Sequence, residues 1–284
     1  MFDFNELTIY FTVGGNQNHY DNMFRCMKSI LNLGIDPKFL VIEFGEKLIT
    51  TPQYEVVNLP EAIDFSKNKK IGYIIWKHKY VGFSFVKTRY GLYVDTDTVA
   101  VNQTFDYYFS NIRNGILVSR HFWVPTINAY NVRAVQPDLI QETMNLEIKL
   151  GLKPSDPFFA GGVIGFEKNP QTQEVFADVV KMYNDYYGEN VDYVRSITDE
   201  LFFAAALAKK PSLIRDAGGA LNHCSMGEEF MPLYYHNKTL YGKNSFETVS
   251  NPITFLHCDT GRRDPSEKYS GDAKEIIKRK FELL

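Results

Sequence analysis

Cysteine is scarce in this chain of 284 residues, and its placement excludes two kinds of stabilised scaffold. Cys26, Cys224 and Cys258 are odd in number, lie far apart and form no CxxC pair. We therefore expect neither a zinc knuckle nor a disulfide framework. The lack of paired cysteines is typical of a protein in a reducing compartment. The first residues, MFDFNELTIYF, also lack the basic and long apolar regions of a signal peptide. Together these features predict a cytoplasmic protein.

Long hydrophobic runs and an excess of one charge are missing too. No stretch of about 18 apolar residues occurs, so no transmembrane segment is expected. The 31 basic and 34 acidic residues give a formal net charge of -3, which offers no electrostatic attraction for nucleic acid. The chain is instead 44% hydrophobic, with 18 Tyr and 22 Phe, and such a composition predicts a packed globular core.

Short apolar segments alternate with segments of helical spacing. Strands are predicted at residues 7–13, 38–44, 91–101, 116–119, 163–166 and 253–256, and helices at 20–33, 71–88, 170–187 and 199–209. This alternation predicts an α/β fold with a single mixed, mainly parallel sheet flanked by helices. Residues 120–157 and 211–250 are rich in Pro, Asn and Tyr, and they are expected to be irregular loops that bind an acceptor.

The strongest chemical signal is a pair of carboxylates, Asp95 and Asp97, which follow the apolar residues Tyr93 and Val94. Open α/β sheets bind ligands at the carboxyl ends of their strands. Alternate residues of an extended strand point the same way, so both carboxylates can converge on one cation. Their oxygens suit Mn²⁺ or Mg²⁺, which neutralises a departing nucleotide diphosphate. The plainer alternative is that Asp-Thr-Asp is only a turn at the strand end.

The same string, VDTDTV, is also similar to the nucleophile motif of haloacid dehalogenase-type phosphatases. In that family the first Asp attacks phosphate, and a late acidic pair and a positioned Lys are required. No Asp-Asp pair occurs in this sequence, and the motif does not follow the first strand. A phosphatase is therefore the disfavoured alternative.

Several segments, in order along the chain, together resemble the family 8 glycosyltransferases, the group of glycogenin and bacterial lipopolysaccharide galactosyl- and glucosyltransferases. They are Asn18-His19-Tyr20, YVDTDTVAV, PFFAGGVIGFEKNPQT, the Asp199-Glu200 segment, and FLH at 255–257 followed by Gly261-Arg262-Arg263. The resemblance implies the GT-A fold and the transfer of a hexose from a UDP-sugar, UDP-glucose or UDP-galactose, to a carbohydrate or other hydroxyl acceptor. It also implies a Mn²⁺ (or Mg²⁺) cofactor and retention of the anomeric configuration, and it leaves the oligomeric state open.

The resemblance also assigns roles to individual residues. The metal ligands would be Asp95, Asp97 and His257, and the catalytic residues would be Asp199, Lys79 and Arg263. The residues that bind the donor would be Thr12, Tyr20, Lys79, Asp95, Thr96, Gly161, Gly162, Gly261 and Arg263. Tyr20 would pack on uracil, and Lys79 and Arg263 would contact the diphosphate.

Several of these residues have a plainer alternative. Arg263, like Arg262, could be an ordinary solvated charge. His257 could be an ordinary core or surface histidine, and Lys79 could decorate a basic helix face beside Lys77. The Gly161-Gly162 pair could be a bulge, and Asp199 could be a helix N-cap.

The sequence departs from the family pattern at several positions. Ala160 stands where the family has Asn, Glu200 stands where it has Gln, and Arg263 stands where it has Lys. Gly261 also stands four residues after His257, one more than in the family. Because of Ala160 and this shift, a catalytically silent nucleotide-sugar-binding protein on the same fold remains an alternative. The expected organisation is one catalytic domain over residues 1–284. It has a nucleotide-binding half at 1–113, an acceptor- and sugar-binding half at 114–265 and a C-terminal helix at 266–284.

Overall fold

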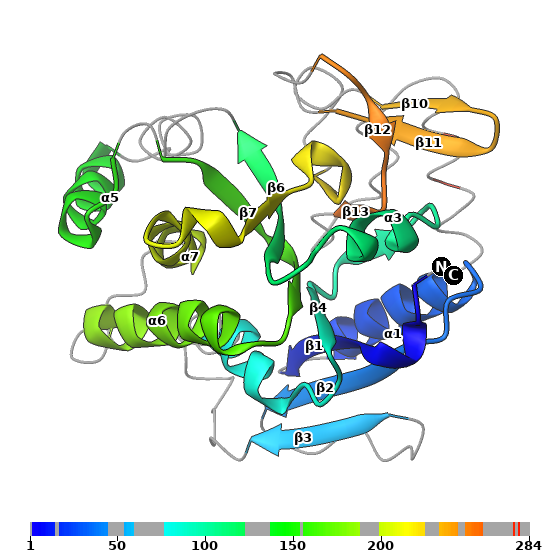
Figure 1. Cartoon of the computed structure of the whole chain (residues 1–284), viewed down its shortest axis with the longest axis horizontal. Helices are drawn as coiled ribbons and strands as arrows, with labels where there is room; N and C mark the ends of the chain where they lie inside the picture. The colour runs from blue at the N-terminus through cyan, green and yellow to red at the C-terminus, as the bar shows by residue number, and fades with distance from the viewer. Residues whose placement is uncertain are drawn as a thin grey trace.

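The computed structural model describes residues 2–14, 17–44, 54–59, 77–122, 137–153, 156–187, 199–224, 233–243 and 248–257, together with Glu275 and Lys278. A central sheet has the strand order β3-β2-β1-β4-β7-β6-β8 (Figure 1). Its strands are β1 (Leu7–Gly14), β2 (Lys38–Phe44), β3 (Glu55–Leu59), β4 (Tyr90–Val94), β6 (Ile116–Phe122), β7 (Phe158–Glu167) and β8 (Ile214–Asp216). Strand β7 is antiparallel to β4 and β6, and the other neighbours are parallel. The predicted mixed, mainly parallel sheet is confirmed.

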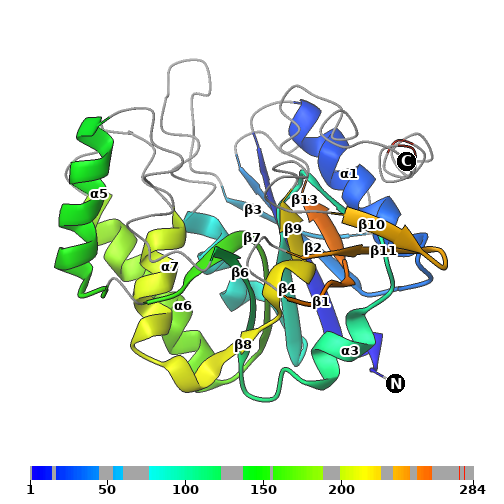
Figure 2. The same cartoon turned by 90° about the horizontal axis from the view of Figure 1, so that it is seen from above.

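Helices cover both faces of this sheet (Figure 2). Helices α1 (Gln17–Leu31) and α3 (Phe105–Ser110) lie on one face, and α5 (Pro137–Leu150), α6 (Pro170–Tyr187) and α7 (Asp199–Ala208) lie on the other. Helix α6 begins where the Asn169 side chain accepts hydrogen bonds from the backbone N–H groups of Gln171 and Thr172. Helix α7 is apolar on all sides, which is typical of a helix buried within a core. Among the described helices, none combines the length and the apolar character needed to cross a membrane.

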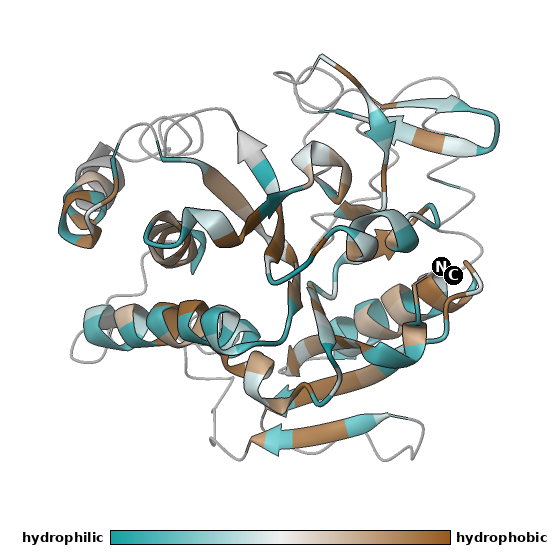
Figure 3. Ribbon diagram, in the orientation of Figure 1, coloured by the Kyte–Doolittle hydropathy of each residue, from teal (hydrophilic) through white to brown (hydrophobic). Residues whose placement is uncertain are grey.

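Successive residues of each strand point to opposite faces of the sheet. Along β1, Leu7, Ile9, Phe11 and Val13 pack with α1, whereas Tyr10 packs on the side of α6 and α7. Strand β4 repeats this arrangement, because Leu92 and Val94 face α1 and Tyr93 faces α7. Figure 3 shows the resulting hydrophobic colour along the buried strands and the mixed colour of α6. The alternation places Tyr10 and Tyr93 on one face of the sheet.

Two small sheets complete the described part of the fold. One consists of β5 (Thr98–Ala100), β13 (Phe255–His257) and β9 (Asn222–Cys224), and the other of β10 (Leu233–His236), β11 (Thr239–Gly242) and β12 (Asn251–Pro252). In the first sheet β13 is antiparallel to β5, so His257 lies opposite Thr98. This pairing brings a late segment of the chain beside the acidic turn.

Several sequence expectations are corrected by the structure. The strand predicted at 91–101 is broken between β4 and β5, because the Thr98 backbone N–H and hydroxyl both donate to the Asp95 carbonyl and close a turn. Of the helix predicted at 71–88, residues 71–76 lie outside the described residues, 77–81 are helical, Gly82–Phe85 form a 3-10 helix and 86–88 are not helical. The predicted loops at 120–157 and 211–250 contain α5 and the strands β8 to β11.

The two predicted halves share one sheet, since β1 to β4 come from residues before 113 and β6 to β8 from residues after it. Of the predicted C-terminal helix at 266–284, the structure describes only Glu275 and Lys278. The division into functional halves therefore stays a prediction, and the helix lies almost wholly outside the described residues.

Candidate active site

Three side chains that could bind one cation meet at the carboxyl edge of the central sheet. The His257 Nε2 atom lies 3.1 Å from Asp97 Oδ1 and 4.0 Å from Asp95 Oδ2. One ligand atom from each of the three residues lies within 4.8 Å of the other two. The side chains are 22% to 30% exposed, so an ion can reach them from solvent.

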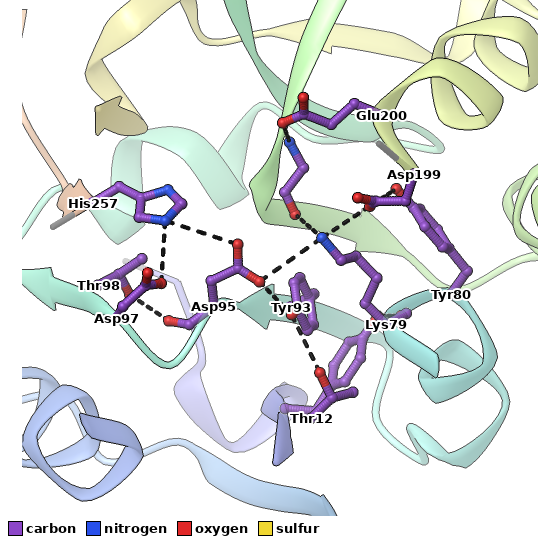
Figure 4. Close-up of polar contacts among 12 residues, drawn as sticks. Thr12, Lys79, Tyr80, Tyr93, Asp95, Asp97, Thr98, Asp199, Glu200 and His257 are labelled. Atoms are coloured by element: carbon purple, nitrogen blue, oxygen red, sulfur yellow. Dashed lines mark hydrogen bonds and ion pairs between the residues drawn. The ribbon is translucent and has the colours of Figure 1, made fainter. Parts of the chain in front are cut away.

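The positions of Asp95, Asp97 and His257 in the backbone explain why their side chains meet (Figure 4). Asp95 directly follows β4, and Asp97 lies in the turn that the Thr98 hydrogen bonds close. His257 ends β13, whose pairing with β5 aims the imidazole at the two carboxylates. Burial alone would raise the pKa of Asp97, but the neighbouring His257 and the hydrogen bond between them hold it below its ordinary value. Asp97 therefore stays ionised and available to a cation.

Gly162 provides the space that His257 occupies. A β-carbon at this position would lie 2.7 Å from His257 Nδ1 and 2.8 Å from Cε1. The backbone around Gly162 is tied to the acidic turn as well, since the Asp95 N–H donates to the Gly162 carbonyl at 2.7 Å. The family resemblance assigns the glycine pair to donor binding. Here Gly162 allows close approach of a candidate metal ligand.

Lys79 is buried inside the site and does not decorate a surface helix. Its Nζ lies 2.9 Å from Asp199 Oδ2 and 3.8 Å from Asp95 Oδ1, and the side chain is only 4% exposed. It also donates to the Gly161 carbonyl at 3.3 Å. Burial would lower the pKa of Lys79, but Asp199 and Asp95 more than offset this and raise it. Lys79 is therefore a permanent positive charge between the two acidic groups.

Asp199 is the first residue of helix α7, and two donors hold its carboxylate. Besides the ion pair with Lys79, its Oδ2 accepts a hydrogen bond from the Tyr80 hydroxyl at 2.7 Å. Burial raises the pKa of Asp199, and the nearby Lys79 opposes that change. The next residue, Glu200, accepts the Gly161 N–H at 2.9 Å. Glu200 thus joins the start of α7 directly to the glycine-containing strand β7, and Asp199 is linked to the same strand through Lys79.

Other residues predicted to bind the donor lie nearby, in different surroundings. Thr12 is buried at the end of β1, with its hydroxyl 3.3 Å from that of Tyr93, and Thr96 is half-buried in the acidic turn. Tyr20 is buried against the sheet and donates to Glu43 at 3.0 Å, so its role beside uracil stays a prediction. Gly261 and Arg263 lie outside the described residues.

Two tyrosines and one glutamate belong to the site although sequence reasoning gave them no role. The Tyr93 hydroxyl donates to Asp95, Tyr80 donates to Asp199, and Glu200 binds the backbone of Gly161. Tyr80 directly follows Lys79, and Tyr93 lies two residues before Asp95 on the same side of β4. The two-residue period of a strand could have indicated the contact between Tyr93 and Asp95, whereas the other two contacts join elements that are distant in sequence.

Comparison with known proteins identifies the fold. A scan against protein-family models and a search of the curated proteins both found no match. Among solved structures, the galactosyltransferase LgtC in complex with donor and acceptor sugar analogues is 12% identical. The TM-score is 0.60, and the match covers 98% of this chain and 96% of the LgtC chain. Mouse xyloside xylosyltransferase 1 is 10% identical, with a TM-score of 0.50 and coverage of 90% of this chain and 98% of that one.

A third neighbour, the glycosyltransferase GlyE of Streptococcus pneumoniae TIGR4, is 10% identical with a TM-score of 0.50. The match covers 96% of this chain, and this chain spans only 59% of the length of the GlyE chain. All three neighbours are sugar transferases, and the chain has their GT-A fold. The acidic turn follows β4, an inner strand of that sheet, and not the first strand as in the phosphatase alternative.

Proposed function

We propose that this protein is a metal-dependent glycosyltransferase that transfers a hexose from a UDP-sugar to a hydroxyl acceptor. The observation that carries the proposal is the convergence of Asp95, Asp97 and His257 at the carboxyl edge of a glycosyltransferase sheet. UDP-glucose and UDP-galactose are the proposed donors, and a carbohydrate is the proposed acceptor. The neighbour that was solved with donor and acceptor sugar analogues supports both kinds of partner.

The ligand chemistry of the site fits Mn²⁺. Two carboxylates and one imidazole are ligands that this ion accepts, and Mg²⁺ would rely more on the oxygens. Bound there, the cation would neutralise charge on the leaving UDP. Without a cation, the described part of the site holds four carboxylates, those of Asp95, Asp97, Asp199 and Glu200, and one lysine, Lys79, so a diphosphate would meet an excess of negative charge there. Metal dependence of donor binding is therefore expected on electrostatic grounds.

The remaining roles follow from position. Lys79 and Asp199 form a buried ion pair beside the cation site. In the proposed reaction Lys79 would supply a fixed positive charge to the diphosphate, and Asp199 would offer a carboxylate to the sugar. Arg263 and Gly261 are proposed to approach the diphosphate from the segment after His257. Retention of anomeric configuration is proposed from the family resemblance. No dedicated base is needed if the departing phosphate accepts the acceptor's proton.

Calorimetry on the variant Asp97→Asn tests the cation site. UDP binding in the presence of Mn²⁺ should be lost, because the imidazole and one carboxylate alone cannot hold the ion near the diphosphate. A matched control is Asp185→Asn, which removes an exposed carboxylate paired with Lys181 on α6. The control should bind UDP and Mn²⁺ as the parent does. Unchanged UDP affinity in folded Asp97→Asn would refute the assignment.

The second candidate, a silent nucleotide-sugar-binding protein, is favoured by two departures from the family pattern. Ala160 stands where the family has Asn, and Gly261 stands four residues after His257, one more than in the family. The two candidates differ in one observable property. A transferase slowly hydrolyses its donor when no acceptor is present, whereas a binding protein leaves the donor intact.

A further inference from the structure

Tyr93 contacts the candidate cation site from inside the protein. Its ring is 1% exposed on the face of β4 that packs toward α7, and its hydroxyl donates a hydrogen bond to Asp95 Oδ1. The Thr12 hydroxyl lies behind it at 3.3 Å, and the Lys79 Nζ lies 5.3 Å from the ring centroid. Strands β1 and β4 are neighbours in the sheet, so Thr12 and Tyr93 are fixed relative to each other.

The two oxygens of Asp95 have different surroundings. Oδ1 receives the Tyr93 hydrogen bond and faces Lys79 at 3.8 Å, whereas Oδ2 faces His257 Nε2 at 4.0 Å. Only Oδ2 therefore points toward the space that Asp97 and His257 also face. Figure 4 shows this division, with Tyr93 and Lys79 on one side of Asp95 and His257 on the other.

We propose that Tyr93 is a positioning residue that holds Asp95 so that Oδ2 alone binds the cation, with Thr12 fixing the Tyr93 hydroxyl. The proposal rests on the proposed cation site and adds a residue to it. It also gives Thr12 a role different from the donor contact expected from sequence, because Thr12 acts through Tyr93. Asp95 is thereby a one-oxygen ligand.

The physical reason is the freedom of a carboxylate about its terminal torsion. That torsion is broad in aspartate, so an unheld carboxylate samples orientations in which neither oxygen faces the ion. Partners that hold a ligating carboxylate typically contribute a factor of about 10–100 in metal affinity. Removing the Tyr93 hydroxyl while keeping its ring should produce a loss of this size without opening a cavity.

The test is direct titration of Tyr93→Phe with Mn²⁺ alone, with free Mn²⁺ measured by electron paramagnetic resonance. The control is Tyr10→Phe, which loses a buried hydroxyl from a ring 5.3 Å away on the same face of the sheet. The Tyr10 hydroxyl donates to the Lys79 backbone carbonyl and not to a carboxylate. Tyr93→Phe should bind Mn²⁺ about 10–100-fold more weakly than the parent, and the control should stay within about twofold. Thr12→Val should show a smaller loss in the same direction.

The outcomes separate this inference from the proposed function. If the parent binds Mn²⁺, Asp97→Asn does not, and Tyr93→Phe equals the parent, the positioning role is refuted and the cation site stands. If Tyr10→Phe loses as much affinity as Tyr93→Phe, loss of any buried hydroxyl explains the effect, and the role is again refuted. If the parent itself binds no Mn²⁺, the cation site and the positioning role fail together.

Discussion

Replacement of Gly162 by alanine should weaken cation binding because it displaces the imidazole of His257. The added β-carbon would lie 2.7 Å from His257 Nδ1, 2.8 Å from Cε1 and 3.0 Å from Asn222 Nδ2. Ordinary van der Waals contact begins at 3.4 Å, so the imidazole must move by about 0.7 Å. Gly162 lies within strand β7 and does not have a positive φ, so alanine introduces no backbone strain.

The expected size of the effect follows from the tolerance of metal sites. Ligand distances in such sites hold within about 0.2 Å, which is much smaller than the required displacement. A misplacement of about 1 Å in an active site can cost a factor of about 100. We therefore expect Gly162→Ala to bind Mn²⁺ between about 10 and 100 times more weakly than the parent.

Isothermal titration with Mn²⁺ measures this change, and circular dichroism checks that the variant is folded. The matched control is Gly165→Ala on the same strand, where the β-carbon would meet Leu117 side-chain atoms at 3.2 Å. That contact needs a shift of only a few tenths of an ångström and lies away from the cation site, so Mn²⁺ affinity should be unchanged. A folded Gly162→Ala protein with the parent's Mn²⁺ affinity would show that His257 is not a ligand.

Three further results are expected. Lys79→Met leaves Asp199 buried without its ion pair and should lower the free energy of unfolding by about 3–5 kcal/mol in chemical denaturation; a loss under 1 kcal/mol would contradict the buried pair. Arg263→Ala should lower kcat about 10²–10³-fold if this residue stabilises the leaving diphosphate, and an effect within twofold in a steady-state assay would remove that role. Burial raises the pKa of Glu167, but the Asn114 N–H and then Arg89 more than offset this and lower it. Because a lowered carboxyl pKa stabilises the fold above the unfolded value of about 4.3, that stability is lost as the pH falls through the folded value. The melting temperature of Glu167→Gln should therefore fall less steeply with decreasing pH below about 4.3 than that of the parent. An unchanged slope would refute the contribution of Glu167 to stability.

The sequence predicted the five inner strands of the central sheet, β1, β2, β4, β6 and β7, because they contain clear apolar runs. It missed the edge strands β3 and β8, which are only partly buried and lack such runs. It did not predict the break between β4 and β5, since Val99 and Ala100 continue the apolar pattern and the turn depends on hydrogen bonds to the Asp95 carbonyl. Helix α5 was missed because residues 120–157 are rich in turn formers, and its pairing with the core is a tertiary effect.

The candidate site also has features that the sequence could predict and features that it could not. The metal ligands could be selected from residue type and order, and the structure brings Asp95, Asp97 and His257 together through the pairing of β13 with β5. The burial of Lys79 was not predictable from its basic surroundings, because it depends on Asp199, which is distant in sequence. Contacts that join separate elements were therefore the part that sequence reasoning could not supply.

Donor turnover tests the central claim most directly. The protein is incubated with UDP-glucose and with UDP-galactose, with and without Mn²⁺, and released UDP is measured by chromatography. We expect slow UDP release from at least one donor without any acceptor, dependent on Mn²⁺ and absent in Asp97→Asn. If neither donor is hydrolysed in the presence of Mn²⁺, and neither is bound, the proposal that this protein transfers a hexose from a UDP-sugar is contradicted.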